Sequence, residues 1–149
     1  MSVRVLIVDD HPVVREGLRA VLGAAADVTV VAECGSGTDA VRLAADLRPD
    51  VVLMDLRLPD LDGVEATRRI VAAGSAHVLV LTTYDTDGDI ARAVAAGATG
   101  YLLKDSPRQE LAEAVRSAAR GETVLAATVA AKLVSSVRGG RPSLTRREL

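Results

Sequence analysis

Short apolar runs alternate with amphipathic segments along most of the chain. The apolar runs are rich in Val, Leu and Ile, as strands buried on both faces of a sheet are. They cover residues 3–8, 29–32, 51–54, 77–81 and 99–103. After each run, apolar residues recur at helical spacing, over residues 12–22, 36–47, 64–73, 87–96 and 107–120. The pattern predicts five strand–helix units in succession.

This alternation indicates an α/β fold. Strands separated by helices pair in parallel through right-handed crossovers, and the helices then cover both faces of the sheet. For five such units we expect a flavodoxin-like, doubly wound, five-stranded parallel sheet with strand order 2-1-3-4-5. Ligand sites in doubly wound sheets lie at the carboxyl ends of the strands, near the point where the winding direction reverses.

Polar residues follow the predicted strands at that edge. Asp9 and Asp10 follow the first strand, Asp55 the third, Thr82 the fourth and Lys104 the fifth. Since the first and third strands are neighbours in the predicted order, the three carboxylates converge in one crevice. They would raise each other's pKa unless a cation lay among them, and Mg²⁺ prefers such oxygen ligands. Each residue alone is commonly a cap, a turn or a surface charge, but all five together predict a magnesium site.

The residues at this edge favour phosphoryl transfer. A carboxylate is ionised at neutral pH and attacks phosphorus directly in aspartyl-phosphate proteins. Lys104 offers a point charge, and Thr82 offers a hydroxyl donor, to the phosphoryl oxygens. No convincing general acid is nearby, because His11 starts a helix and His77 opens a strand. We therefore expect a donor that brings its own good leaving group, such as a phosphorylated imidazole.

Composition narrows the partners and the location. The chain has 149 residues, which suits one domain, and a net charge of −2, which offers no general attraction to nucleic acid. Its aromatic residues are two tyrosines, too few for stacking on bases. The single cysteine, Cys34, fits a reducing compartment. No apolar run approaches the roughly 20 residues of a membrane span, and no signal peptide is evident. We expect a cytoplasmic protein without a membrane partner.

Four segments together resemble the receiver domains of two-component response regulators. They are VLIVDDH (5–11), VVLMDLRLPDLDG (51–63), VLVLTTYD (78–85) and GATGYLLKD (97–105). The resemblance covers residues 3 to about 120 without a major gap. It implies a signalling domain that accepts a phosphoryl group from a sensor histidine kinase and catalyses only its own phosphorylation and dephosphorylation.

The resemblance also assigns roles to single residues. Asp55 corresponds to the phosphoacceptor, and Asp9 and Asp10 to the acidic pair that holds Mg²⁺. The backbone carbonyl of Arg57 corresponds to a further metal ligand, and Lys104 to the catalytic lysine of the family.

A conformational switch is implied as well. Thr82 corresponds to the catalytic and switch hydroxyl, which moves toward the phosphoryl group. Tyr101 corresponds to the switch aromatic, which then rotates inward. The face formed by the fourth helix, fifth strand and fifth helix is remodelled as a result.

The segments DDHPVVREGL, GYLLKD and SLTRREL narrow the resemblance to the NarL/FixJ type, whose receivers precede a LuxR-type helix-turn-helix domain. It implies a receiver over 1–121, a linker helix and hinge over 122–142, and the start of a truncated DNA-binding domain at 143–149. Helical spacing over 123–137 supports the linker helix, with a plain terminal helix docked on the receiver as the alternative. The expected output is transcriptional regulation, with DNA bound through the missing domain and a homodimer formed on phosphorylation.

Three rival interpretations make different demands on the sequence. A magnesium-dependent aspartyl phosphohydrolase commonly has a second acid two residues after its nucleophile, where this chain has Arg57. A nucleotide-binding domain needs a glycine-rich turn after the first strand, but Gly35 and Gly37 follow the second. A receiver-like interaction module that works without phosphorylation would not need the complete set of site residues that this chain has.

Overall fold

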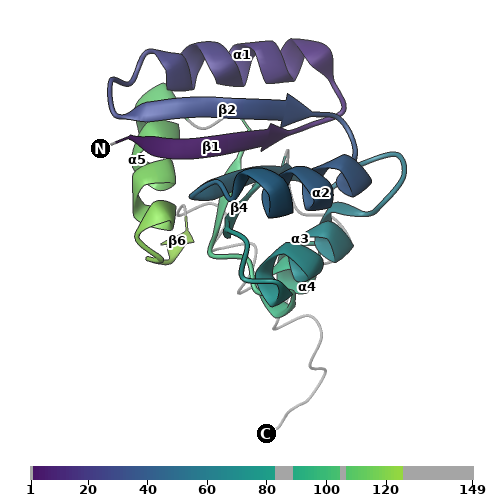
Figure 1. Cartoon of the computed structure of the whole chain (residues 1–149). Coiled ribbons are helices and arrows are strands. Elements are labelled where there is room, and N and C mark those ends of the chain that lie inside the picture. The colour runs from purple at the N-terminus through teal and green to yellow at the C-terminus, as the bar shows by residue number, and fades with distance from the viewer. Residues whose placement is uncertain (1, 83–88, 105–106, 126–149) are drawn as a thin grey trace, which may run out of the picture.

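The computed structural model describes residues 2–82, 89–104 and 107–125. Strands and helices alternate along this part of the chain (Figure 1). The strands are β1 (Val3–Val8), β2 (Val28–Cys34), β3 (Val51–Asp55), β4 (His77–Thr82), β5 (Gly100–Leu103) and β6 (Val124–Leu125). The helices are α1 (Pro12–Gly23), α2 (Gly37–Leu47), α3 (Gly63–Ala72), α4 (Asp89–Ala95) and α5 (Arg108–Ala119). The five predicted strand–helix units are therefore confirmed.

The strands form one parallel sheet in the order β2-β1-β3-β4-β5-β6. The predicted doubly wound order of the first five strands is confirmed. Because β1 lies between β2 and β3, the winding direction reverses beside β1. The carboxyl ends of β1 and β3 are thus neighbours, as a site at this edge requires.

The sixth strand was not predicted. Residues Val124 and Leu125 were expected to belong to a linker helix, and this was wrong: they pair in parallel with Gly100 and Tyr101 of β5. Gly100 allows the approach, because a Cβ at that position would lie 2.7 Å from Cβ of Val124. The open edge of β5 offers backbone hydrogen bonds to these residues, and this pairing is favoured over the helix that their apolar spacing predicted. Residues 126–142 of the predicted linker and the 143–149 segment lie outside the described residues.

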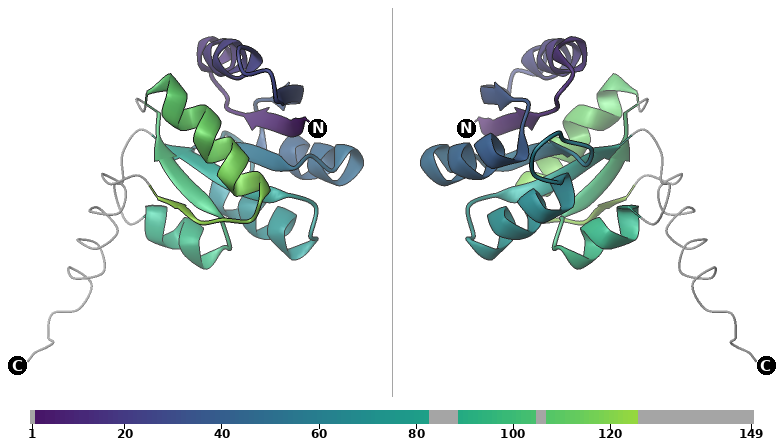
Figure 2. Two further views of the ribbon diagram at one scale, coloured as in Figure 1. Left: turned by 90° about the vertical axis from the view of Figure 1, so that its left-hand side faces the viewer. Right: turned by 90° about the vertical axis from the view of Figure 1, so that its right-hand side faces the viewer.

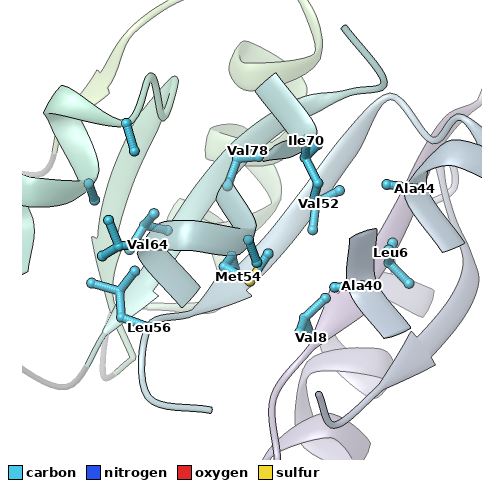
Figure 3. Close-up of a cluster of buried hydrophobic side chains, with 14 of the residues drawn as sticks. Leu6, Val8, Ala40, Ala44, Val52, Met54, Leu56, Val64, Ile70 and Val78 are labelled. Carbon is cyan, nitrogen blue, oxygen red and sulfur yellow. The ribbon is translucent and has the colours of Figure 1, made fainter. Parts of the chain in front are cut away.

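Helices cover both faces of the sheet (Figure 2), and an apolar layer fills the space between the sheet and the helices on each face. Along β1, Val5 and Ile7 pack with residues of α1 and α5, whereas Leu6 and Val8 pack with residues of α2 and α3. Figure 3 shows the second layer, where side chains of β1 and β3 meet those of α2 and α3. Strands buried on both faces explain why the sequence shows continuous apolar runs instead of alternation.

The ladder extends to the end of β3. Asp55, predicted to follow the strand, is its last residue and pairs with Leu81 of β4. The backbone of Asp55 consequently belongs to the β3–β4 ladder and not to the loop that follows it. None of the helices in the described part of the chain is long and apolar enough to span a lipid bilayer.

Candidate functional site

The polar residues predicted to gather at the carboxyl edge do so. Asp9, Asp55 and Thr82 are buried there, with 1%, 5% and 6% of their surface exposed. Val8 and Met54 are paired, so the residues that follow them, Asp9 and Asp55, stand side by side at the carboxyl ends of neighbouring strands. Carboxylate oxygens of Asp9, Asp10 and Asp55 and a ring nitrogen of His11 all lie within 4.8 Å of one another.

Lys104 bridges the two buried acids. Its Nζ lies 2.8 Å from Oδ2 of Asp9 and 3.4 Å from Oδ2 of Asp55. The Lys104 backbone N–H donates to the carbonyl of Thr82, which holds Lys104 beside the end of β4. Burial lowers the pKa of Lys104, but its close contact with the Asp9 carboxylate and the charge of Asp55 outweigh it and raise the pKa overall. Lys104 is therefore a cation at neutral pH.

Burial dominates the electrostatics of Asp55. It raises the pKa of this carboxyl group, against the opposing charge of Lys104 and the backbone N–H of Arg57. That N–H donates to Oδ1 of Asp55 over 3.3 Å. The charge of Asp9 adds to the increase in pKa. The ionised form of Asp55 is less stable here than in water, so a further cation at the site would favour it.

Two oxygens at this edge are buried without accepting a hydrogen bond from the described residues. They are Oδ2 of Asp9 and Oδ1 of Asp10, although each has a nitrogen at ion-pair distance. Buried polar atoms without hydrogen bonds are costly and rare. Three carboxylates facing one ammonium also leave an excess of negative charge. Hard oxygen donors with this charge balance fit Mg²⁺.

His11 lies closer to the acids than predicted. It is the N-cap residue of α1, as expected for a residue that starts a helix. Its backbone N–H donates to Oδ1 of Asp9 over 2.9 Å, and its Nδ1 lies 3.2 Å from Asp9 Oδ1 and 3.0 Å from Asp10 Oδ1. His77 is remote from this site: it begins β4 at the opposite edge, where its ring hydrogen-bonds to Thr99.

Tyr101 is buried on the face of the sheet covered by α3 and α4. Its hydroxyl donates to the carbonyl of Ala98 over 3.1 Å, and burial raises its pKa to about 12. The inward rotation of Tyr101, the switch role of Thr82 and the metal-binding carbonyl of Arg57 stay predictions.

The loop after Asp55 contributes contacts that the sequence analysis did not single out. The carboxylate of Asp60 accepts hydrogen bonds from two backbone N–H groups at the start of α2. Gly63 packs against the Asp55 backbone so closely that a Cβ would lie 2.3 Å from the Asp55 carbonyl oxygen. A hollow of about 510 Å³ opens beside the acids, lined by Asp10, Leu56, Arg57, Leu58, Pro59, Asp60, Asp62 and Arg92.

The fold and this edge define a doubly wound domain with a buried acidic pocket and a lysine between its acids. Comparison with known proteins identifies the family: residues 5–116 match the response regulator receiver domain. The chain therefore belongs to the response regulator receiver family.

Transcriptional regulators are among its relatives. The chain is 44% identical to the uncharacterized transcriptional regulatory protein YxjL of Bacillus subtilis, over 90% of this chain and 62% of that protein. It is also 44% identical to the transcriptional regulatory protein LiaR of the same species, over 99% of this chain and 73% of that protein. The chain thus spans less than two thirds of the length of YxjL.

Solved structures agree. The response regulator ChrA of a heme-sensing two-component system is 46% identical, with a TM-score of 0.81 over 97% of this chain and 70% of that chain. A LuxR-family response regulator from Aurantimonas sp. SI85-9A1 is 35% identical, with a TM-score of 0.85 over 93% of this chain and 99% of that chain. The resemblance stated from the sequence is confirmed.

Proposed function

We propose that this chain is the phosphoacceptor switch of a transcriptional two-component system. In this proposal Asp55 accepts a phosphoryl group from a sensor histidine kinase in a magnesium-dependent reaction. The observation that carries the proposal is the pair of buried acids on neighbouring strands, Asp9 and Asp55, with Lys104 between them. Membership of the response regulator receiver family supports a role for these residues in phosphoryl transfer.

The transfer forms one bond and breaks one. A carboxylate oxygen of Asp55 bonds to phosphorus as the bond from phosphorus to the imidazole nitrogen of the donor breaks, so the imidazole leaves with that electron pair. Lys104 neutralises charge on a phosphoryl oxygen, and the Thr82 hydroxyl donates a hydrogen bond to another. The approach brings two anions together, which explains why a cation beside Asp55 is needed.

The side chains of Asp9, Asp10 and Asp55 and the carbonyl of Arg57 would hold Mg²⁺. When bound, the ion supplies positive charge that shields the phosphoryl oxygens from the carboxylates. The two buried oxygens of Asp9 and Asp10 that accept no hydrogen bond support this assignment. Chemistry by this chain is limited to its own phosphorylation and dephosphorylation.

Phosphorylation would act through Thr82 and Tyr101. The new phosphoryl group adds nearly two negative charges and strong acceptor oxygens at the end of β3. Thr82, buried at the end of the neighbouring β4, is drawn toward it, and Tyr101 on β5 responds by changing its orientation. The phosphoryl group thereby shifts an equilibrium between two conformations.

The output we propose is control of transcription. The resemblance of residues 143–149 to the start of a helix-turn-helix domain, and the transcriptional regulators among the relatives, support DNA as the final partner. Phosphorylation would promote a homodimer that binds DNA through that domain. A cytoplasmic location is part of this proposal, and the single cysteine, Cys34, which fits a reducing compartment, supports it.

The test is intact-mass spectrometry after incubation with acetyl phosphate, with and without Mg²⁺. Wild type is expected to gain one phosphoryl group only when Mg²⁺ is present, and Asp55→Asn is expected to gain none. Asp50→Asn is the matched control, since it changes an aspartate next to the same strand at the opposite edge. Wild-type protein without an adduct would favour the phosphorylation-independent interaction module. An unchanged adduct on Asp55→Asn would show that another residue, and not Asp55, is the phosphoacceptor.

A further inference from the structure

The loop between β3 and α3, residues 56–62, is tied to the start of another helix. Oδ1 of Asp60 accepts a hydrogen bond from the backbone N–H of Gly37 over 2.9 Å. Oδ2 of Asp60 accepts one from the N–H of Thr38 over 3.2 Å. A residue of the phosphoacceptor loop thus caps the N-terminus of α2, which begins 23 residues earlier in the chain.

Close packing accompanies these hydrogen bonds. A Cβ at Gly37 would lie 2.2 Å from the carbonyl oxygen of Leu61 and 2.8 Å from its Cβ. Only a glycine lets the two backbones approach this closely. The start of α2 and the middle of the loop are therefore one packed unit.

Asp60 does not merely replace a missing cap. The α2 helix already has its own cap, because the hydroxyl of Ser36 accepts a hydrogen bond from the N–H of Asp39 over 3.1 Å. Asp60 binds the two preceding N–H groups and brings a negative charge to the positive end of the helix dipole. Its bonds join two segments, whereas those of Ser36 stay within one.

The ends of the loop are held as well. The N–H of Gly63 donates to the carbonyl of Leu56 over 3.1 Å, and Asp62 caps α3 by accepting from the N–H of Val64 over 2.7 Å. Arg57 lies between Leu56, whose carbonyl accepts the bond from Gly63, and Asp60. Its N–H contacts Asp55, and its carbonyl is the metal ligand proposed above.

We propose that Asp60 is a positioning residue of the magnesium and phosphoryl site. By fastening the loop to α2, it holds the Arg57 backbone where its N–H meets Asp55 and where its carbonyl would serve as a metal ligand. This inference rests on the proposed function. It adds a determinant of metal affinity that touches neither the metal nor the phosphoryl group.

The fastening persists over the working pH range. Hydrogen bonds from the Thr38 side chain and from the backbone N–H groups of Leu61, Gly37 and Thr38 hold the pKa of Asp60 far below its ordinary value. The carboxylate therefore stays ionised, and accepts all of these bonds, wherever the protein is folded near neutral pH.

The decisive experiment is calorimetric titration of Mg²⁺ into wild type, Asp60→Ala and Ser36→Ala, with a thermal unfolding curve for each. Both variants lose a cap of α2, but only Asp60→Ala releases the loop. We expect Asp60→Ala to weaken Mg²⁺ binding about tenfold, at the lower end of the range for residues behind metal ligands. Ser36→Ala should change it less than about twofold. Asp60→Asn, whose single amide oxygen accepts one of the two bonds, should fall between and serves if Asp60→Ala does not fold.

Equal Mg²⁺ affinities in wild type and Asp60→Ala would overturn the positioning role. Equal losses of Mg²⁺ affinity in Asp60→Ala and Ser36→Ala would also overturn it, because Asp60 would then act only by stabilising α2. These results differ from failure of the proposed function. In that case wild type itself would bind no Mg²⁺ and accept no phosphoryl group from acetyl phosphate, and the inference about Asp60 would fall with it.

Discussion

The two edges of the central sheet treat their polar groups differently. At the amino edge, Arg4 and Asp50 satisfy each other: the Arg4 N–H donates to the Asp50 carboxylate over 2.8 Å, and the Asp50 N–H donates to the Arg4 carbonyl over 2.9 Å. The Arg4 guanidinium also closes the end of α2 by donating to the carbonyls of Leu47 and Arg48.

The carboxyl edge leaves its groups incompletely satisfied. Within the described ranges, both buried side-chain oxygens without a hydrogen bond belong to this edge, in Asp9 and Asp10. Burial works against the charge of Asp55, and Lys104 pairs with Asp9 and Asp55 but with no third carboxylate among the contacts of the described residues. One sheet therefore has an edge completed by its own residues and an edge arranged for an external cation and anion. Polar groups that are buried without all of their hydrogen bonds lower the stability of the fold, and such groups are typical of functional sites.

Gly63→Ala at the carboxyl edge should cause the largest combined loss of stability and phosphorylation rate. In Gly63→Ala the new Cβ meets the Asp55 carbonyl oxygen and Cα of Leu56, which are backbone atoms that cannot move aside cheaply. We expect a loss of stability of about 1–3 kcal/mol. Displacement of Asp55 should slow phosphorylation by acetyl phosphate on the order of 100-fold. Denaturant unfolding and the rate of adduct formation measure the two effects.

Gly17→Ala is the control for that substitution. Gly17 lies within α1, and a Cβ there meets nothing within 4 Å. The variant should gain about 0.5–1 kcal/mol of stability, because alanine favours the helix, and should be phosphorylated at the wild-type rate. Similar losses in both glycine variants would contradict a specific role for the tight contact at Gly63.

Removing one carboxylate from each edge should change stability in opposite directions. Asp55→Asn removes a buried charge whose pKa is raised by burial, while Lys104 keeps Asp9 as a partner. We expect a gain on the order of 1 kcal/mol at neutral pH without divalent cations. Asp50→Ala removes an acceptor that Arg4 uses, and should lose about 0.5–1.5 kcal/mol. Changes of the same sign in the two variants would refute the contrast between the edges.

The advantage of Asp55→Asn should depend on pH. Below the ordinary value of 3.8 the carboxyl group is protonated in both folded and unfolded chains, so it contributes no difference. As the pH rises, the unfolded chain releases its proton first, because the pKa is raised in the folded protein. Wild type therefore loses stability relative to Asp55→Asn until the pH exceeds the raised value. Thermal unfolding from pH 4 to 7 should show this gap opening, and Mg²⁺ should narrow it by stabilising wild type.

Tyr101 lies between the two edges, and its substitution should affect stability alone. Tyr101→Phe keeps the buried ring and removes the hydroxyl that donates to Ala98. A loss of about 0.5–1.5 kcal/mol is expected, with phosphorylation of Asp55 unchanged. Slower phosphorylation of this variant would contradict the prediction, because it would show that the Tyr101 hydroxyl contributes to the reaction at Asp55.

Much of this arrangement was predictable because it depends on local pattern. Continuous apolar runs identify strands buried on both faces, and crossover handedness orders them, so Asp9, Asp55 and Lys104 were expected at one edge before any distance was known. The two-residue strand β6 was missed since Val124 and Leu125 fit a helical spacing equally well. Their pairing is decided by the open edge of β5, which is a property of the folded sheet.

Asp60 was missed for a related reason. The amides that it binds belong to Gly37 and Thr38, and a cap supplied from another segment leaves no local signature. The pattern Asp-Leu-Asp-Gly over 60–63 was visible, but it reads as a turn followed by the ordinary cap at Asp62. The contacts of His11 with both acids likewise arise from the entry angle of α1, which sequence spacing does not specify.

The sixth strand has a mechanical consequence. Within the described residues β6 joins the sheet through β5, at Gly100 and Tyr101, and it is two residues long. Detaching so short a strand costs few hydrogen bonds and leaves the ladders of the other five strands intact. The β6 strand is thus attached to the backbone of Gly100 and Tyr101 by a two-residue ladder, which can open without unfolding the rest of the sheet.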